Sequence, residues 1–109
     1  MPHWVRVAEL AEHPPGSAWE CAVADRIVAL FNVAGEVSAL DGVCPHQGGP
    51  LGKGCLTGAT ITCPWHGWQF DVRTGQSLLS RTIRQPTYAV RIDEGGVWID
   101  LESNAPPGD

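Results

Sequence analysis

Two short motifs in this chain each combine a cysteine with a histidine at a spacing suited to metal binding. One residue separates Cys44 from His46, two separate Cys63 from His66, and sixteen residues lie between the two pairs. Cysteine thiolates and histidine imidazoles are ligands of zinc and of iron–sulfur clusters. The four side chains therefore predict a metal centre of Cys₂His₂ type.

The order of the residue types within each pair distinguishes zinc from an iron–sulfur cluster. A zinc finger usually groups its two cysteines in one close pair and its two histidines in another. Here each pair is mixed, which fits a [2Fe–2S] cluster in which one iron takes two thiolates and the other takes two imidazoles. We therefore expect Cys44, His46, Cys63 and His66 to ligate one [2Fe–2S] cluster. A zinc-stabilised interaction module is the remote alternative.

The segments that carry the two pairs are rich in Gly and Pro, so we expect residues 43–54 and 63–68 to form loops between strands. Runs of β-branched, aromatic and alternating apolar residues predict the strands themselves. The predicted strands are residues 4–8, 20–23, 27–33, 36–40, 55–57, 60–62, 69–71, 88–93 and 97–101. Ala34-Gly35 and Glu94-Gly95-Gly96 are expected hairpin turns. The fold class is therefore predicted to be all-β.

Length and composition limit the domain count and the classes of partner. The chain has 109 residues, so we expect one domain over residues 1–103, with a flexible tail over residues 104–109 that contains two prolines. A net charge of −5 with one lysine provides no basic face for nucleic acid. No apolar stretch approaches the roughly 18–20 residues of a membrane span, and the N-terminus does not resemble a secretion signal. We expect a cytoplasmic protein that binds neither nucleic acid nor membrane.

The remaining cysteines and histidines are expected to have no part in the metal centre. Cys21 and Cys55 are predicted to be small buried apolar residues, because a disulfide is unexpected in a reducing compartment. His3 and His13 are distant in sequence from both pairs and are expected at the surface. The sequence contains no Ser/His/Asp set, paired-carboxylate motif or phosphate-binding loop, so no catalytic residue is predicted.

The two motifs resemble those of the Rieske family. Residues 44–51, Cys-Pro-His-Gln-Gly-Gly-Pro-Leu, match the family pattern cysteine-any-histidine, and residues 63–71, Cys-Pro-Trp-His-Gly-Trp-Gln-Phe-Asp, match cysteine-any-any-histidine. The resemblance implies a Rieske-type iron–sulfur fold of stacked antiparallel sheets with the cluster at the tip of two loops. It also implies ligation through the Nδ1 atoms of His46 and His66, with the ring edges near solvent.

The resemblance also implies roles for residues next to the ligands. The backbone N–H groups of the residues that follow the ligand histidines are expected to point at the cluster sulfides; these residues are Gln47, Gly48, Gly67 and Trp68. The alternative is that their N–H groups take part only in ordinary turn geometry. Pro86 resembles the proline-bearing loop that covers the cluster, or else it is a simple strand-edge proline. Trp65 and Trp68 either shield the cluster from water or serve only as packing.

Three positions indicate the branch of the family. Rieske proteins of cytochrome bc complexes carry an extra cysteine in each motif, and the two cysteines form a disulfide; the matching residues here are Gly49 and Trp65. Those proteins also carry a serine that donates a hydrogen bond to a bridging sulfide, and the matching residue here is Trp68. The chain thus resembles soluble Rieske ferredoxins, or the similar small subunit of NAD(P)H nitrite reductases. The implied partners are a flavin-dependent reductase and a terminal oxygenase, or a nitrite reductase large subunit. With fewer hydrogen bonds to sulfur, the potential should lie low in the family span of roughly −150 to +300 mV.

Overall fold

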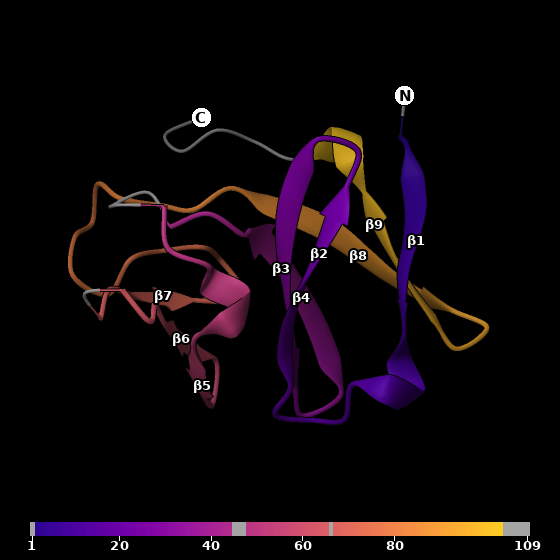
Figure 1. The fold of residues 1–109 in the computed structure, drawn as a ribbon, viewed down its shortest axis with the longest axis horizontal. Coiled ribbons are helices and arrows are strands. Elements are labelled where there is room, and N and C mark those ends of the chain that lie inside the picture. Colours follow the sequence, from indigo (N-terminus) through magenta and orange to yellow (C-terminus); the bar gives the residue numbers. More distant parts are fainter. Residues whose placement is uncertain (1, 45–47, 66, 104–109) are drawn as a thin grey trace.

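The computed structural model describes residues 2–44, 48–65 and 67–103, which form nine strands and three short 3₁₀ helices (Figure 1). The strands are β1 Trp4–Glu9, β2 Ala18–Val23, β3 Arg26–Val33, β4 Glu36–Asp41, β5 Cys55–Thr57, β6 Thr60–Thr62, β7 Gln69–Asp71, β8 Thr87–Asp93 and β9 Gly96–Asp100. The 3₁₀ helices are η1 Leu10–Glu12, η2 Leu51–Lys53 and η3 Leu101–Ser103. Among the described residues there is no α-helix, and the predicted all-β fold class is confirmed.

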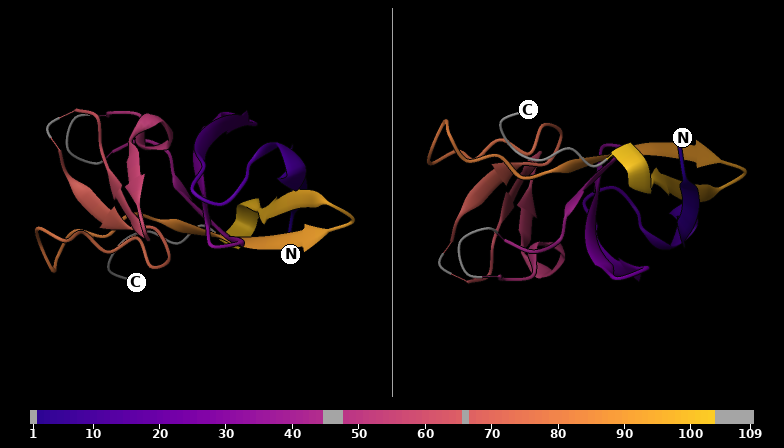
Figure 2. Two further views of the ribbon diagram at one scale, coloured as in Figure 1. Left: turned by 90° about the horizontal axis from the view of Figure 1, so that it is seen from below. Right: turned by 90° about the horizontal axis from the view of Figure 1, so that it is seen from above.

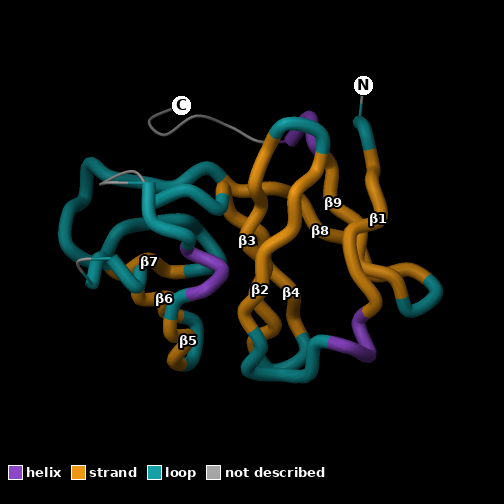
Figure 3. Tube along the Cα trace, viewed as in Figure 1, coloured by secondary structure: helices purple, strands orange, loops and turns teal. Residues whose placement is uncertain are grey.

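The strands form two antiparallel sheets that lie side by side along the long axis of the molecule (Figures 1 and 2). The larger sheet has the order β1-β9-β8-β4-β3-β2, and the smaller has the order β5-β6-β7. β8 pairs with β4 at only two positions and with β9 at five, so the larger sheet opens where β4 and β8 diverge. Loops predominate at the end of the molecule that carries the smaller sheet (Figure 3).

Two hairpins of the larger sheet turn through residues with positive φ. Ala34 and Gly35, between β3 and β4, have φ of 54° and 95°, and Glu94 and Gly95, between β8 and β9, have 51° and 77°. Two consecutive positive φ values are what a type I′ turn requires, and that turn matches the twist of the strands it joins. Both turns lie where the sequence predicted them.

Two hydrophobic clusters lie on opposite faces of β3 and β4. The first, which we call the loop-side cluster, consists of Ala29, Phe31, Val33, Leu40, Cys44, Leu51, Ile61, Cys63, Phe70 and Val72. The second, which we call the distal cluster, consists of Val23, Val28, Leu30, Ala39, Tyr88, Val97, Ile99 and Leu101. Successive side chains of a strand point to opposite faces, so β3 contributes to both clusters and is buried on both sides.

The structure differs from the expected elements mainly in its 3₁₀ helices, none of which was predicted. Leu101, predicted as the end of the last strand, begins η3. Asp100 and Ser103 explain the change, because the Asp100 carboxylate accepts from the Glu102 N–H and the Ser103 hydroxyl donates to the Asp100 carbonyl. The predicted tail, residues 104–109, lies outside the described residues. None of the helices described is long and apolar enough to cross a membrane.

Candidate metal centre

The two predicted thiolate ligands are buried in the loop-side cluster. Cys44 follows β4 and is 2% exposed, while Cys63 follows β6 and is 1% exposed. The two predicted imidazole ligands, His46 and His66, lie outside the described residues. For that reason the described part of the chain contains no group of three or more metal-ligating side chains.

The first loop is closed by backbone hydrogen bonds across its ligand motif. The Cys44 N–H donates to the Gly49 carbonyl at 2.8 Å, and the Gly48 N–H donates to the Cys44 carbonyl at 2.9 Å. Gly48 has a φ of +77°, a conformation that a side chain would strain. These bonds bring both ends of the motif together at Cys44. The role predicted for the Gly48 N–H toward a cluster sulfide stays a prediction, as does that of Gln47, which lies outside the described residues.

The second loop is closed in a similar way. The Cys63 N–H donates to the Trp68 carbonyl at 2.7 Å, and Gly67 has a φ of +72°. Trp68 is half-buried against the loop-side cluster, where its ring lies 6.5 Å from that of Phe70. Trp65 is 50% exposed. Trp68 therefore packs against the core, whereas Trp65 lies at the surface; whether either residue, or the Gly67 N–H, acts on a cluster stays a prediction.

The two loops meet at Gly49. A Cβ atom added to Gly49 would lie 2.8 Å from the Cys63 Sγ, 3.0 Å from the Trp65 Cγ and 3.1 Å from the Trp65 Cβ. Real Cβ atoms do not approach so closely, so the loops pack this tightly only because residue 49 has no side chain. Gly49 and Trp65, which match the disulfide positions of the cytochrome bc proteins, thus face each other. Two buried thiols from two touching loops fit the thiolate half of a [2Fe–2S] cluster.

A residue that sequence reasoning missed holds the start of the first loop. Gln85 is buried, and its side-chain amide donates to the backbone carbonyls of Asp41 and Val43. No motif marks it, because a single glutamine in a predicted loop has no informative spacing. Its neighbour Pro86 is half-buried, and its carbonyl accepts from the Asp41 N–H at 2.9 Å. The cluster-covering role predicted for Pro86 stays a prediction.

The remaining cysteines depart in part from expectation. Cys55 was predicted to be buried but is exposed, because it starts β5, an edge strand of the three-stranded sheet. Cys21 is half-buried on β2, and this burial raises the pKa of its thiol. Cys21 and Cys55 form no disulfide.

The two histidines outside the motifs differ from each other. His3 is exposed, as predicted. His13 is half-buried, because its ring stacks on Trp19 with 3.7 Å between the ring centroids.

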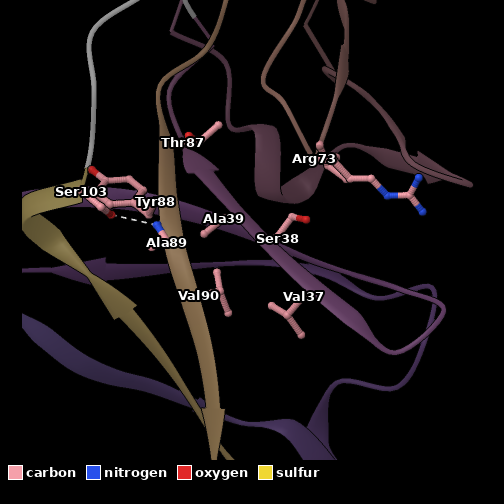
Figure 4. Close-up of a pocket in the computed structure, with 10 residues that line it drawn as sticks. Val37, Ser38, Ala39, Arg73, Thr87, Tyr88, Ala89, Val90 and Ser103 are labelled. Carbon is pink, nitrogen blue, oxygen red and sulfur yellow. Dashed lines mark hydrogen bonds between the residues drawn. The ribbon is translucent and has the colours of Figure 1, made fainter.

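Two cavities lie apart from the two thiols. One of about 350 Å³ lies where β4 and β8 diverge, with Val37 and Val90 on its walls and Arg73 at its rim (Figure 4). Another of about 420 Å³ is lined by residues that include Arg26, Val43 and Tyr88. Neither of these two cavities is lined by Cys44 or Cys63.

Comparison with known proteins places the chain among small redox proteins. The model of the Rieske [2Fe-2S] domain matches residues 3–89. The ferredoxin component of the naphthalene 1,2-dioxygenase system of Pseudomonas aeruginosa is 36% identical over 99 residues, covering 90% of this chain and 95% of the relative.

Solved structures are similar over most of the chain. A chain in a complex of reduced oxygenase and oxidized ferredoxin in carbazole 1,9a-dioxygenase has a TM-score of 0.86 and 28% identity, covering 94% of this chain and 97% of that one. A putative NADH-dependent nitrite reductase small subunit from Mycobacterium tuberculosis has a TM-score of 0.83 and 23% identity, covering 92% and 96%. The second likeness concerns the fold alone.

Proposed function

The chain belongs to the Rieske [2Fe–2S] domain family, and from this membership we propose that it is a one-electron carrier that delivers electrons to a terminal oxygenase. The observation that carries the proposal is end-to-end similarity to a ferredoxin. The match to the naphthalene 1,2-dioxygenase ferredoxin component covers 95% of that relative, which leaves little of it without a counterpart here. The [2Fe–2S] cluster of the family supplies the redox centre.

We propose that Cys44, His46, Cys63 and His66 hold this cluster. Burial of the two thiols supports the assignment, since the loop-side cluster keeps water from Cys44 and Cys63. The contact between the loops at Gly49 also supports it, because one ligand from each loop can then reach each iron. The chain's own part is to hold the two loops at a fixed separation and to exclude water from the thiolates.

We propose that a flavin-dependent reductase is the electron donor and that exchange takes place in the cytoplasm. A net charge of −5 suits docking to a basic patch on a partner, which would accelerate encounter. Exposed apolar side chains near the loops suit a short-lived contact; they are Val43, Trp65, Leu78 and Leu79. Pairing with a nitrite reductase large subunit has support only from the fold.

We propose that residues 1–103 work as one domain. β3 and β4 each contribute side chains to both hydrophobic clusters, so neither cluster is complete without these strands. The two sheets are therefore expected to fold together.

The experiment that tests the function replaces a ligand and a matched cysteine. Cys63→Ser should abolish the visible absorption, the bound iron and the rhombic, low-average-g EPR signal of the reduced protein. Cys55→Ser should keep all three, because Cys55 is exposed and outside the loops. The reduced wild type should also reduce a purified Rieske-type oxygenase. Colourless wild-type protein that contains zinc would overturn the proposal.

A further inference from the structure

The four residues that lead into the first loop have no free backbone polar group. Each N–H and each C=O from residue 41 to residue 44 has a hydrogen-bond partner. The four N–H groups donate as follows: Asp41 to the Pro86 carbonyl, Gly42 to the Ile27 carbonyl, Val43 to the Asp41 Oδ1 and Cys44 to the Gly49 carbonyl. The four carbonyls accept as follows: Gly42 from the Leu51 N–H, Cys44 from the Gly48 N–H, and both Asp41 and Val43 from the Gln85 Nε2. The position of Cys44 is therefore fixed both by its own backbone hydrogen bonds to Gly48 and Gly49 and by those of the three residues that precede it.

One side chain supplies two of these eight interactions. The Nε2 atom of Gln85 lies 2.7 Å from the Asp41 carbonyl oxygen and 2.6 Å from that of Val43. A primary amide carries two hydrogens on one nitrogen, so a single Gln85 amide can donate to both carbonyls. Gln85 is 2% exposed, so its amide makes these two hydrogen bonds from a buried position.

The segment that carries Gln85 is anchored to the strand that follows the second loop. The Gln85 N–H donates to the Gly75 carbonyl at 2.7 Å, and Gly75 N–H donates to the carbonyl of Asp71, the last residue of β7. A side chain at Gly75 would overlap the Gln85 carbonyl oxygen, so the two backbones approach as closely as they can. Gln85 thus connects the chain leaving the second loop to the chain entering the first.

We propose that Gln85 is a positioning residue for the metal centre, and that it holds Cys44 in register with Cys63 by clamping the carbonyls of Asp41 and Val43. This inference rests on the proposed ligation by Cys44. The clamp acts on backbone rather than on the ligand itself, so its loss should leave a cluster that assembles but is held less uniformly. The expected result is a looser site, not an absent one.

The experiment compares Gln85→Met with Asn32→Leu. Met has nearly the length of Gln but no donor. Asn32 is a matched control, since it is also 2% exposed and also donates to a backbone carbonyl, that of His13. We expect Gln85→Met to lose its visible absorption in the folded state at least about tenfold faster than wild type, as the loss of two hydrogen bonds predicts. Its EPR lines should broaden and its midpoint potential should shift, whereas Asn32→Leu should retain the wild-type spectrum and potential.

Each outcome has a distinct meaning. If Gln85→Met and Asn32→Leu behave alike, the positioning role is overturned while the proposed function stands. If the wild type itself holds no Rieske cluster, the proposed function fails. If Gln85→Met does not fold, the clamp is tested instead by hydrogen exchange of side-chain amides in the wild-type protein. The Gln85 amide hydrogens should then exchange more slowly than those of half-buried Gln69, which donates to the Thr62 hydroxyl, and equal rates would overturn the clamp.

Discussion

The loop-side and distal clusters differ in what they support: the first surrounds the proposed metal centre, and the second stabilises the larger sheet. The loop-side cluster contains both proposed thiolate ligands and lies between two strands of the larger sheet, β3 and β4, and the three-stranded sheet, whose strands are three residues long. The distal cluster contains no thiol among its buried members and rests on the strands of five to eight residues in the larger sheet. Short strands make few hydrogen bonds, so the half with the metal centre depends more on ligand bonds than the distal half does.

β3 shows how one strand serves both halves. Leu30 and Phe31 are neighbours in sequence, both are fully buried, and they belong to different clusters. A change on one face of β3 or β4 therefore acts mainly on one half of the molecule. Matched substitutions on the two faces should separate the stability of the metal centre from that of the fold.

The largest expected effect comes from truncating one buried residue in each cluster. Phe70→Ala in the loop-side cluster should cost about 3–5 kcal/mol and Ile99→Ala in the distal cluster about 2–5 kcal/mol, because each leaves a cavity in a close-packed core. On heating, Phe70→Ala should lose visible absorption well before far-UV circular dichroism reports unfolding. Ile99→Ala should lose both signals together, because the distal cluster supports the whole sheet.

The two signals must be recorded in the same thermal ramp. Coincident transitions in both variants would mean that the metal centre is lost only when the whole chain unfolds, and that the loop-side cluster has no separate effect on the metal centre.

A smaller effect is expected from Gly49→Ala, which acts on the contact between the loops. The new methyl group would lie 2.8 Å from the Cys63 Sγ, so the loops must separate at a cost of about 1–3 kcal/mol. The control is Gly58→Ala: Gly58 has a φ of +59°, but a Cβ there meets no atom within 4 Å. Both variants should lose stability, and only Gly49→Ala should lose iron and change the EPR spectrum. Full iron content in Gly49→Ala would show that the loops move apart without affecting the site.

Much of the fold could be predicted because local patterns determine it. β5, β6 and β7 have the predicted bounds, since each is a short β-rich run limited by turn residues. η2 was missed because its sequence, Leu-Gly-Lys, has no helical pattern, and it forms where Lys53 N–H and Gly54 N–H find the carbonyls of Pro50 and Leu51. Local pattern also failed for Cys55, whose exposure follows from its place at a sheet edge.

In the candidate site, too, some residues could be predicted from local sequence and one could not. The ligand motifs could be predicted because the spacing of Cys44, His46, Cys63 and His66 is itself the signal. Gln85 could not, because its partners Asp41 and Val43 are more than forty residues away and only the folded topology brings them together.

The smallest expected effect is a pH dependence that belongs to the distal cluster. Burial, reinforced by the nearby Asp41 carboxylate, raises the pKa of Tyr88, and hydrogen bonding from Arg26 offsets part of the increase. Above about pH 10, the ordinary tyrosine value, the unfolded chain releases a proton that the folded chain retains. The stability that Tyr88 contributes is therefore complete below about pH 10 and is lost as the pH rises through the folded-state value.

Tyr88→Phe isolates this contribution. At neutral pH Tyr88 keeps its proton in both the folded and the unfolded chain, so the difference in stability between variant and wild type there is the reference value. As the pH rises above about 10, the wild type should lose stability relative to the variant, since phenylalanine does not ionise. Cys21, whose pKa burial also raises, is present in both proteins and cancels in the comparison. Denaturant unfolding followed by far-UV circular dichroism from pH 7 to 11 measures the effect. A difference that stays constant to pH 11 would mean that Tyr88 ionises equally in both states, and that the alkaline sensitivity of the fold arises outside the distal cluster.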